Sequence, residues 1–196
     1  MEQKRKVAVY TGNRAEYGLQ YPILKSLEDC AALKTSLIVS GAHLDEDFGL
    51  TRSEIERDGF SVFREAPITL TGDSLFDTAK AIAVLSQYSN KIQDYKPPRT
   101  FDKKGLPIIA IPTTAGTGSE VTHHSVIIDT TSNNQEKISC RGEGFVPIVS
   151  IVDYELTLSK PRRLTIDSAI DTLTHGIEAY VSKKATLFSD RMALDT

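Results

Sequence analysis

The chain has 196 residues, of which 40% are hydrophobic and 25% are charged, so it can bury one good core as an ordinary soluble globular protein. A formal net charge of -3 gives no reason to expect a nucleic acid or an acidic membrane surface as a partner. The basic start at residues 4–6 is not followed by a signal-peptide core, and no apolar run approaches the roughly 20 residues that span a bilayer. Two cysteines far apart in sequence, Cys30 and Cys140, favour a reducing compartment, so we predict a cytoplasmic protein.

The first sixty residues alternate between strand and helix patterns. We predict a strand at residues 7–10, a loop at 11–18, a helix at 21–30, a strand at 36–39, a loop at 40–49 and a helix at 51–57. This order is a βαβ unit, which requires a parallel sheet and a right-handed crossover. Because ligands bind beyond the carboxyl ends of such strands, the two loops lie where a ligand would bind.

Several motifs in this part carry a resemblance. TGNRAEYG at residues 11–18 and FGLTRSEIERDGF at residues 48–60 resemble the N-terminus of hydrolysing UDP-N-acetylglucosamine 2-epimerases, over about residues 7–60. The resemblance implies that Arg14 contacts the diphosphate of a UDP-sugar, as a bidentate guanidinium can. The alternative is a solvated Arg14 paired with Glu16. We find no positions that match the catalytic carboxylates and histidine of that family.

The middle of the chain leads into a small-residue loop. Residues 63–67 are predicted as a weak link, 68–71 as a short strand, a helix begins near Leu75, and 91–104 form a polar connection. A buried strand at 106–111 runs into PTTAGTGSEVT at residues 112–122. Small hydroxyl and glycine residues can place backbone N–H groups around a ribose or a phosphate without obstruction. Residues 126–129 and 137–139 then read as an antiparallel hairpin.

The last part reads as an apolar run at 146–152 followed by a long helix. Pro161 fits its first turn, and apolar residues recur at helical spacing from Thr165 onward. Asp171 and His175 are four residues apart, so their side chains project from one face of this helix. They can chelate one divalent cation, or they can form an ordinary helix-surface hydrogen bond.

From about residue 74 onward, the chain resembles the iron-containing (group III) alcohol dehydrogenases. The motifs that carry the resemblance are DTAKA at 77–81, TTAGTGSE at 113–120, and SIVD at 150–153 followed by DSAIDTLTHGIE at 167–178. It implies hydride transfer between NAD(P) and an alcohol or aldehyde, with a bound Fe²⁺ or Zn²⁺. The residues that it assigns to the cofactor are Gly72, Ser74, Asp77, Thr113, Thr114, Thr117 and Lys137, and those that it assigns to the metal are Asp171 and His175. Two more metal ligands of that family are histidines further downstream than Thr196.

Some residues depart from this pattern or stay open. The family has GGGS where this chain has TGDS, so Asp73 adds a side chain and a negative charge and is expected to weaken cofactor binding. Lys137 lies against a cofactor ribose by resemblance, or it is an exposed strand lysine. His123 and His124 are not predicted as ligands, because adjacent residues of an extended segment point to opposite faces.

Taken together, the patterns predict an α/β fold, a Rossmann-like parallel sheet of about five strands flanked by helices, with the start of an α-helical metal-binding domain at the C-terminus. We divide the chain into an epimerase-like segment (1–66), a dinucleotide-binding segment (67–158) and an incomplete helical segment (159–196). Three functions remain open: an alcohol dehydrogenase, a UDP-sugar enzyme or binding module, and an inactive fusion or fragment. Exposure of Ile170, Leu173 and Ile177 predicts self-association into a homo-oligomer.

Overall fold

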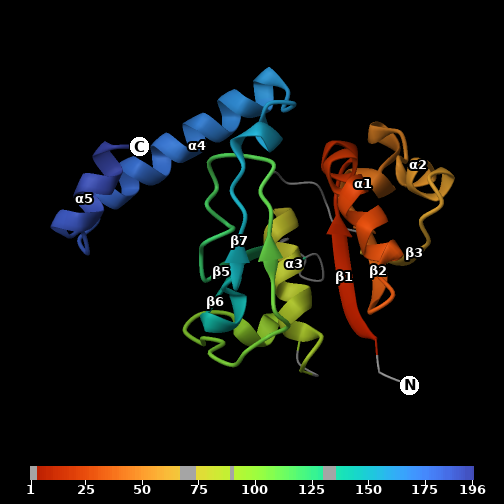
Figure 1. Cartoon of the computed structure of the whole chain (residues 1–196). Helices are drawn as coiled ribbons and strands as arrows, with labels where there is room; N and C mark the ends of the chain where they lie inside the picture. Colours follow the sequence, from red (N-terminus) through yellow and green to blue (C-terminus); the bar gives the residue numbers. More distant parts are fainter. Residues whose placement is uncertain (1–3, 67–73, 89–90, 130–135) are drawn as a thin grey trace.

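The computed structural model describes residues 4–66, 74–88, 91–129 and 136–196 (Figure 1). The helices and strands, in chain order, are β1 (Arg5–Thr11), α1 (Arg14–Asp29), β2 (Leu33–Ser40), α2 (Arg52–Arg57), β3 (Val62–Ala66), α3 (Ser74–Leu85), β4 (Ile109–Ala110), β5 (His124–Asp129), β6 (Glu136–Arg141), β7 (Val149–Ser150), α4 (Arg162–Val181) and α5 (Leu187–Leu194). Short 3₁₀ turns lie at η1 (Gly41–Leu44), η2 (Glu46–Phe48), η3 (Ile92–Tyr95), η4 (Glu143–Phe145) and η5 (Tyr154–Thr157).

Three strands within residues 5–66 form a parallel sheet in the order β1-β2-β3. The predicted βαβ unit is confirmed, since β1 and β2 pair in parallel from Arg5 opposite Leu33 to Thr11 opposite Val39. The prediction of a weak link at residues 63–67 was wrong, because β3 pairs in parallel with β2 there. The five residues of β3 are too few for their sequence pattern to identify a strand without the neighbouring β2.

Helix α1 begins at Arg14, seven residues earlier than predicted. Its N-cap is Asn13, whose side-chain oxygen accepts a hydrogen bond from the backbone N–H of Glu16 at 2.9 Å. The Glu16 carboxylate accepts in turn from the backbone N–H of Gly12 at 3.0 Å. The bond to Asn13 satisfies one backbone donor that the start of a helix leaves free, and the bond to Glu16 fixes the turn before it, so the TGNRAE stretch is a helix start.

The core under this sheet is a cluster of aromatic and aliphatic side chains contributed by α1, β2 and the α2 region. Its buried members are Tyr17, Leu24, Leu37, Val39, Ile55 and Phe60. The Tyr17 hydroxyl keeps a polar partner, because it donates to the Asp58 carboxylate at 2.7 Å. This cluster packs the helices onto the sheet and leaves the carboxyl ends of β1 and β2 at one edge.

The second half of the described structure contains two further sheets. Strands β4 and β7 pair in parallel, whereas β5 and β6 form an antiparallel pair. The five parallel strands that the sequence predicts are therefore split over two sheets, and the predicted hairpin is confirmed. The strand predicted at 106–111 is much shorter than expected, since only Ile109–Ala110 forms ladder pairs, and the apolar run at 146–152 contributes only Val149–Ser150.

A second core cluster joins the end of α3, the η3 turn and the hairpin. It consists of Val84, Tyr95, Phe101, Ile138, Cys140 and Phe145. The ring of Phe101 stacks edge-on against Tyr95 with centroids 4.8 Å apart, a favourable arrangement for two aromatic rings. This cluster packs α3 against the β5–β6 hairpin, into which the small-residue loop at 112–122 leads.

Helices α4 and α5 form an arm that extends away from the strands (Figure 1). Pro161, which the sequence places in the first turn of this helix, is the N-cap residue of α4, and the helix begins at Arg162. The predicted exposure of three apolar residues is confirmed: 58% of Ile170, 52% of Leu173 and 54% of Ile177 remain accessible. Within the described ranges, no helix combines the length and the hydropathy needed to cross a membrane.

Candidate cofactor and metal site

The small-residue loop connects the carboxyl end of β4 to β5. Thr113, Thr114 and Thr117 are half-buried in it, and Ser119 is buried. Their hydroxyls and backbone N–H groups lie beyond the end of a parallel strand, which is where ligands bind in α/β sheets. The structure therefore gathers these three predicted cofactor residues at one edge.

Helix α3 is hydrogen-bonded to this loop through Asp77, whose side chain is buried at 4% exposure. One carboxylate oxygen accepts from the backbone N–H of Val126 at 2.9 Å, and the other from the Ser119 hydroxyl at 3.3 Å. The hydroxyl of Ser125 donates to the backbone carbonyl of Asp77 at 2.7 Å. Asp77 thus ties both the end of the loop and the start of β5 to α3.

Lys80 was missed by sequence reasoning, although it is fully buried one turn further along α3. Its ammonium donates to the carbonyls of Thr122 and His124 at 3.0 and 2.9 Å and lies 3.8 Å from the Asp77 carboxylate. Burial lowers the pKa of Lys80, and the charge of Asp77 opposes that shift. The available signal was the i, i+3 pair of opposite charges on a helix whose other residues are mostly apolar.

The loop also presses against α4 at Gly116. A Cβ atom added to Gly116 would lie 2.5 Å from the Ser168 carbonyl oxygen and 2.7 Å from the Thr172 hydroxyl oxygen. The backbone φ of Gly116 is +135°, a conformation that residues with a side chain rarely adopt. Thr172 directly follows Asp171, so this contact brings the predicted cofactor loop to the helix of the predicted metal ligands.

Asp171 and His175 lie one turn apart on α4, as predicted. A carboxylate oxygen of Asp171 is 3.8 Å from the imidazole Nε2 of His175, too far for a hydrogen bond. Both atoms can still lie at the roughly 2.1 Å that carboxylate and imidazole ligands keep from Zn²⁺, so the pair fits a cation as two of its ligands. Among the described residues, no group of three or more His, Cys, Asp or Glu side chains forms a metal cluster.

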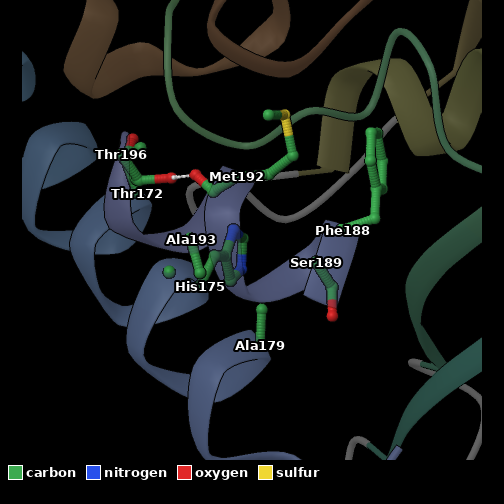
Figure 2. Close-up of a pocket in the computed structure, with 9 residues that line it drawn as sticks. Thr172, His175, Ala179, Phe188, Ser189, Met192, Ala193 and Thr196 are labelled. Carbon is green, nitrogen blue, oxygen red and sulfur yellow. Dashed lines mark hydrogen bonds between the residues drawn. The ribbon is translucent and has the colours of Figure 1, made fainter. Parts of the chain in front are cut away.

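His175 also borders a hollow between α4 and α5 with a volume of about 360 Å³. Figure 2 shows His175 among side chains of both helices, with Phe188, Met192 and Ala193 contributed by α5. Apolar atoms make up most of the lining beside the imidazole. Of the two candidate ligands, His175 therefore lines this largely apolar hollow.

The other predicted cofactor residues lie apart or outside the description. Gly72, Asp73 and the predicted strand at 68–71 are outside the described residues, and Ser74 is the first residue of α3. Lys137 is exposed on β6, which leaves its predicted ribose contact open. Arg14 pairs with Glu54 at 2.8 Å, and not with Glu16 as the alternative reading expected.

The remaining histidines have protein partners. His43 is fully buried between the hydroxyls of Thr11 and Thr51, at 3.1 and 2.7 Å from its two ring nitrogens. Burial lowers the pKa of His43 to about 4. The prediction that His123 and His124 face opposite sides was wrong, because their ring centroids are 4.3 Å apart. The strand alternation does not reach His123, which precedes β5.

A loop of small hydroxyl residues lies at the end of a parallel strand, where ligands bind in α/β sheets, and it meets the helix that carries Asp171 and His175. The comparisons identify the class of protein. Residues 58–154 match the profile of the family described as iron-containing alcohol dehydrogenase. The NAD-dependent methanol dehydrogenase of Bacillus methanolicus is 42% identical over 141 residues, which are 70% of this chain and 36% of that protein. A long-chain-alcohol dehydrogenase of Geobacillus thermodenitrificans is 45% identical over 131 residues, 65% of this chain and 32% of that protein.

The solved structures extend the likeness over almost the whole chain. An iron-containing alcohol dehydrogenase of Thermotoga maritima superposes with a TM-score of 0.69 at 31% identity, covering 98% of this chain and 52% of that one. A 1,3-propanediol oxidoreductase superposes with a TM-score of 0.71 at 27% identity, covering 97% of this chain and 49% of that one. Together these findings support the iron-containing alcohol dehydrogenase family for this chain, with the profile match beginning at residue 58.

The sequence likeness and the fold likeness cover different parts of the chain and of the relatives. The chain spans about a third of the length of the curated relatives named above. The fold likeness includes the first sixty residues, although the profile match does not. The N-terminal sheet therefore lies within the part of the chain that superposes on these solved structures.

Proposed function

We propose that this chain supplies the cofactor-binding part and the first two metal ligands of an NAD(P)-dependent alcohol dehydrogenase. The observation that carries the proposal is the contact of Gly116 with Ser168 and Thr172, which joins the loop to the helix of Asp171 and His175. An enzyme that transfers hydride needs its cofactor and its alcohol-polarising metal at adjacent positions. The relatives support the same function, and the substrate is an alcohol or aldehyde by that likeness.

In this proposal, some residues of the chain bind the cofactor or the metal, and others hold the binding loop in position. Thr113, Thr114 and Thr117 bind the ribose and phosphate groups of the dinucleotide, and Asp77 holds the loop in position for them. Asp171 and His175 would hold Fe²⁺ or Zn²⁺. Such a metal, when bound, polarises the alcohol oxygen while NAD(P) accepts the hydride. A catalytic metal generally has three or more protein ligands, so further ligands must come from residues other than those described.

A titration of the purified chain with NADH tests the proposal. We expect saturable binding in the micromolar range, and Thr117→Val should weaken it about five- to tenfold, as expected for the loss of one hydrogen bond. Thr100→Val, at an exposed threonine of the connection after η3, is the matched control and should leave the affinity unchanged. Binding that no loop threonine influences would contradict the proposed site.

A UDP-sugar site is the second candidate, favoured by the position of Arg14. Its side chain is 73% exposed at the start of α1, just beyond the carboxyl end of β1, and Glu54 orients its guanidinium. An oriented guanidinium beside a helix N-terminus suits a diphosphate. UDP-N-acetylglucosamine should then bind the chain and lose affinity in Arg14→Gln, independently of NADH.

Binding of neither ligand would leave the third hypothesis, a fusion or fragment without independent activity. The division at about residues 66 and 158 and the cytoplasmic location stay predictions. The homo-oligomer also stays a prediction, and sedimentation of the full chain over a range of concentrations tests it.

A further inference from the structure

Lys160, the residue just before the N-cap of α4, keeps its charged group close to the protein. The side chain is half-buried, and its ammonium donates a hydrogen bond to the Ser168 hydroxyl at 2.5 Å. A surface lysine usually extends its ammonium into water instead. Burial lowers the pKa of Lys160, and the charge of Asp167 opposes that shift. Among the described residues no carboxylate forms an ion pair with this ammonium, so its charge is held beside a neutral hydroxyl.

Ser168 lies on the same face of α4 as the two candidate metal ligands. It precedes Asp171 by three residues and His175 by seven, the spacings that bring side chains to one face of a helix. The backbone carbonyl of Ser168 is also the atom that a Cβ on Gly116 would meet at 2.5 Å. The Lys160 ammonium therefore stands where the small-residue loop, the start of α4 and the face with the candidate ligands meet.

The start of α4 lacks the acidic residues that usually complement the positive end of a helix. Its first turn contains no acidic residue, and Pro161 provides no side-chain cap. The first two residues of the helix are Arg162 and Arg163, which are both exposed. An anionic group beside the Lys160 ammonium gains a charged hydrogen bond, and the uncompensated end of α4 favours the same charge.

We propose that Lys160 determines the substrate specificity of this site by binding the acid group of a short alcohol or aldehyde that carries a carboxylate or a sulfonate at its other end. The inference rests on the proposed function, because the metal held by Asp171 and His175 would bind the alcohol or aldehyde oxygen. It adds the class of substrate, which that function leaves open.

The distance along α4 limits the length of such a substrate. Ser168 precedes the midpoint between Asp171 and His175 by five residues, which is roughly 7.5 Å along a helix axis. A metal–oxygen contact takes up about 2.1 Å and an ammonium–oxygen contact about 2.8 Å. The remaining few ångströms suit a chain of about two to four carbons between the two oxygens.

NMR titration of the isotope-labelled full chain with β-hydroxypropionate and with its neutral amide tests the proposal. The two ligands share their length and their hydroxyl group and differ in charge. No metal is added, because a carboxylate can gain affinity from the metal itself. We expect saturable shifts of the backbone signals around Ser168 and an affinity for the acid at least about tenfold above that for the amide, as a hydrogen bond between charged groups produces.

Three variants assign this preference to one side chain. Lys160→Met should weaken acid binding about tenfold and leave amide binding unchanged, whereas Lys160→Arg keeps the charge and should retain most of the affinity. The matched control is Arg163→Met, which removes one charge from the same end of α4. Arg163 is exposed and five residues before Ser168, hence on another face of the helix, so its loss should change neither affinity. Circular dichroism verifies the fold of each variant.

The comparison of acid and amide needs no variant, and equal affinities would overturn the proposal. Equal losses in Lys160→Met and Arg163→Met would overturn it as well, because the end of the helix would then attract anions without a specific site. Loss of NADH affinity in Lys160→Met, with acid binding unchanged, would make Lys160 a cofactor residue and refute the assignment.

Running the ligand titrations without NADH separates this inference from the proposed function. A chain that prefers the acid through Lys160 but does not bind NADH contradicts the dehydrogenase function and supports the acid site. A chain that binds NADH but does not distinguish acid from amide contradicts the acid site alone.

Discussion

Replacing Gly116 by alanine should separate the small-residue loop at 112–122 from α4. The new methyl group would lie 2.5 Å from the Ser168 carbonyl oxygen, which belongs to the backbone of α4 and cannot rotate away. The backbone φ of +135° adds strain of about 1–3 kcal/mol for a residue with a side chain. We therefore expect Gly116→Ala to displace the loop and to weaken NADH binding by at least tenfold.

Gly118 provides a matched control within the same loop. It also has a positive φ, +65°, but a Cβ atom added there would meet nothing within 4 Å. Gly118→Ala should then show only the left-handed backbone cost, about 1–2 kcal/mol. The difference in NADH affinity between Gly116→Ala and Gly118→Ala therefore measures the effect of the contact with α4 apart from backbone strain.

Urea unfolding followed by circular dichroism gives the stability of each variant, and NADH fluorescence gives its affinity. The chain has no tryptophan, so NADH emission is free of transfer from that residue. Equal loss of NADH affinity in Gly116→Ala and Gly118→Ala would refute the reasoning. Cofactor binding would then depend on loop conformation and not on the contact with α4.

Three further predictions concern two buried titratable groups, His43 and Lys80, and the residue Asp73 before α3. Because burial lowers the pKa of His43 to about 4 from 6.5, the unfolded chain binds this proton first as pH falls. The chain should therefore lose up to about 3 kcal/mol of stability relative to His43→Gln between pH 6.5 and pH 4, measured by urea unfolding; parallel pH profiles would contradict this. Lys80→Met leaves the Asp77 carboxylate buried without its cation and should destabilise the chain by about 3 kcal/mol, with partial recovery in the double variant Asp77→Asn, Lys80→Met. Asp73→Gly, argued from the sequence alone, should tighten NADH binding, and an unchanged titration curve would count against it.

Local patterns were sufficient for most of the elements and for the candidate ligands. The 3.6-residue periodicity of residues 166–177 located α4, and the i, i+4 spacing placed Asp171 and His175 on one face. The polar turn between two short apolar runs located the β5–β6 hairpin. These features depend on residues close together in the chain, so the sequence displays them directly.

The contacts around the candidate site join residues far apart in the chain, and only the tertiary structure reveals them. The Asp77 carboxylate reaches Val126, Lys80 reaches His124, and Gly116 meets Ser168. Local sequence could also not show that β3 pairs with β2, or that the parallel strands divide into two sheets. Periodicity and capping arise within one or two turns of chain, whereas pairing and burial depend on which distant segments pack together. The amino-acid pattern thus indicated the helix, the loop and the candidate ligand residues, and the packing of α3 and α4 around the loop decided that they lie close together.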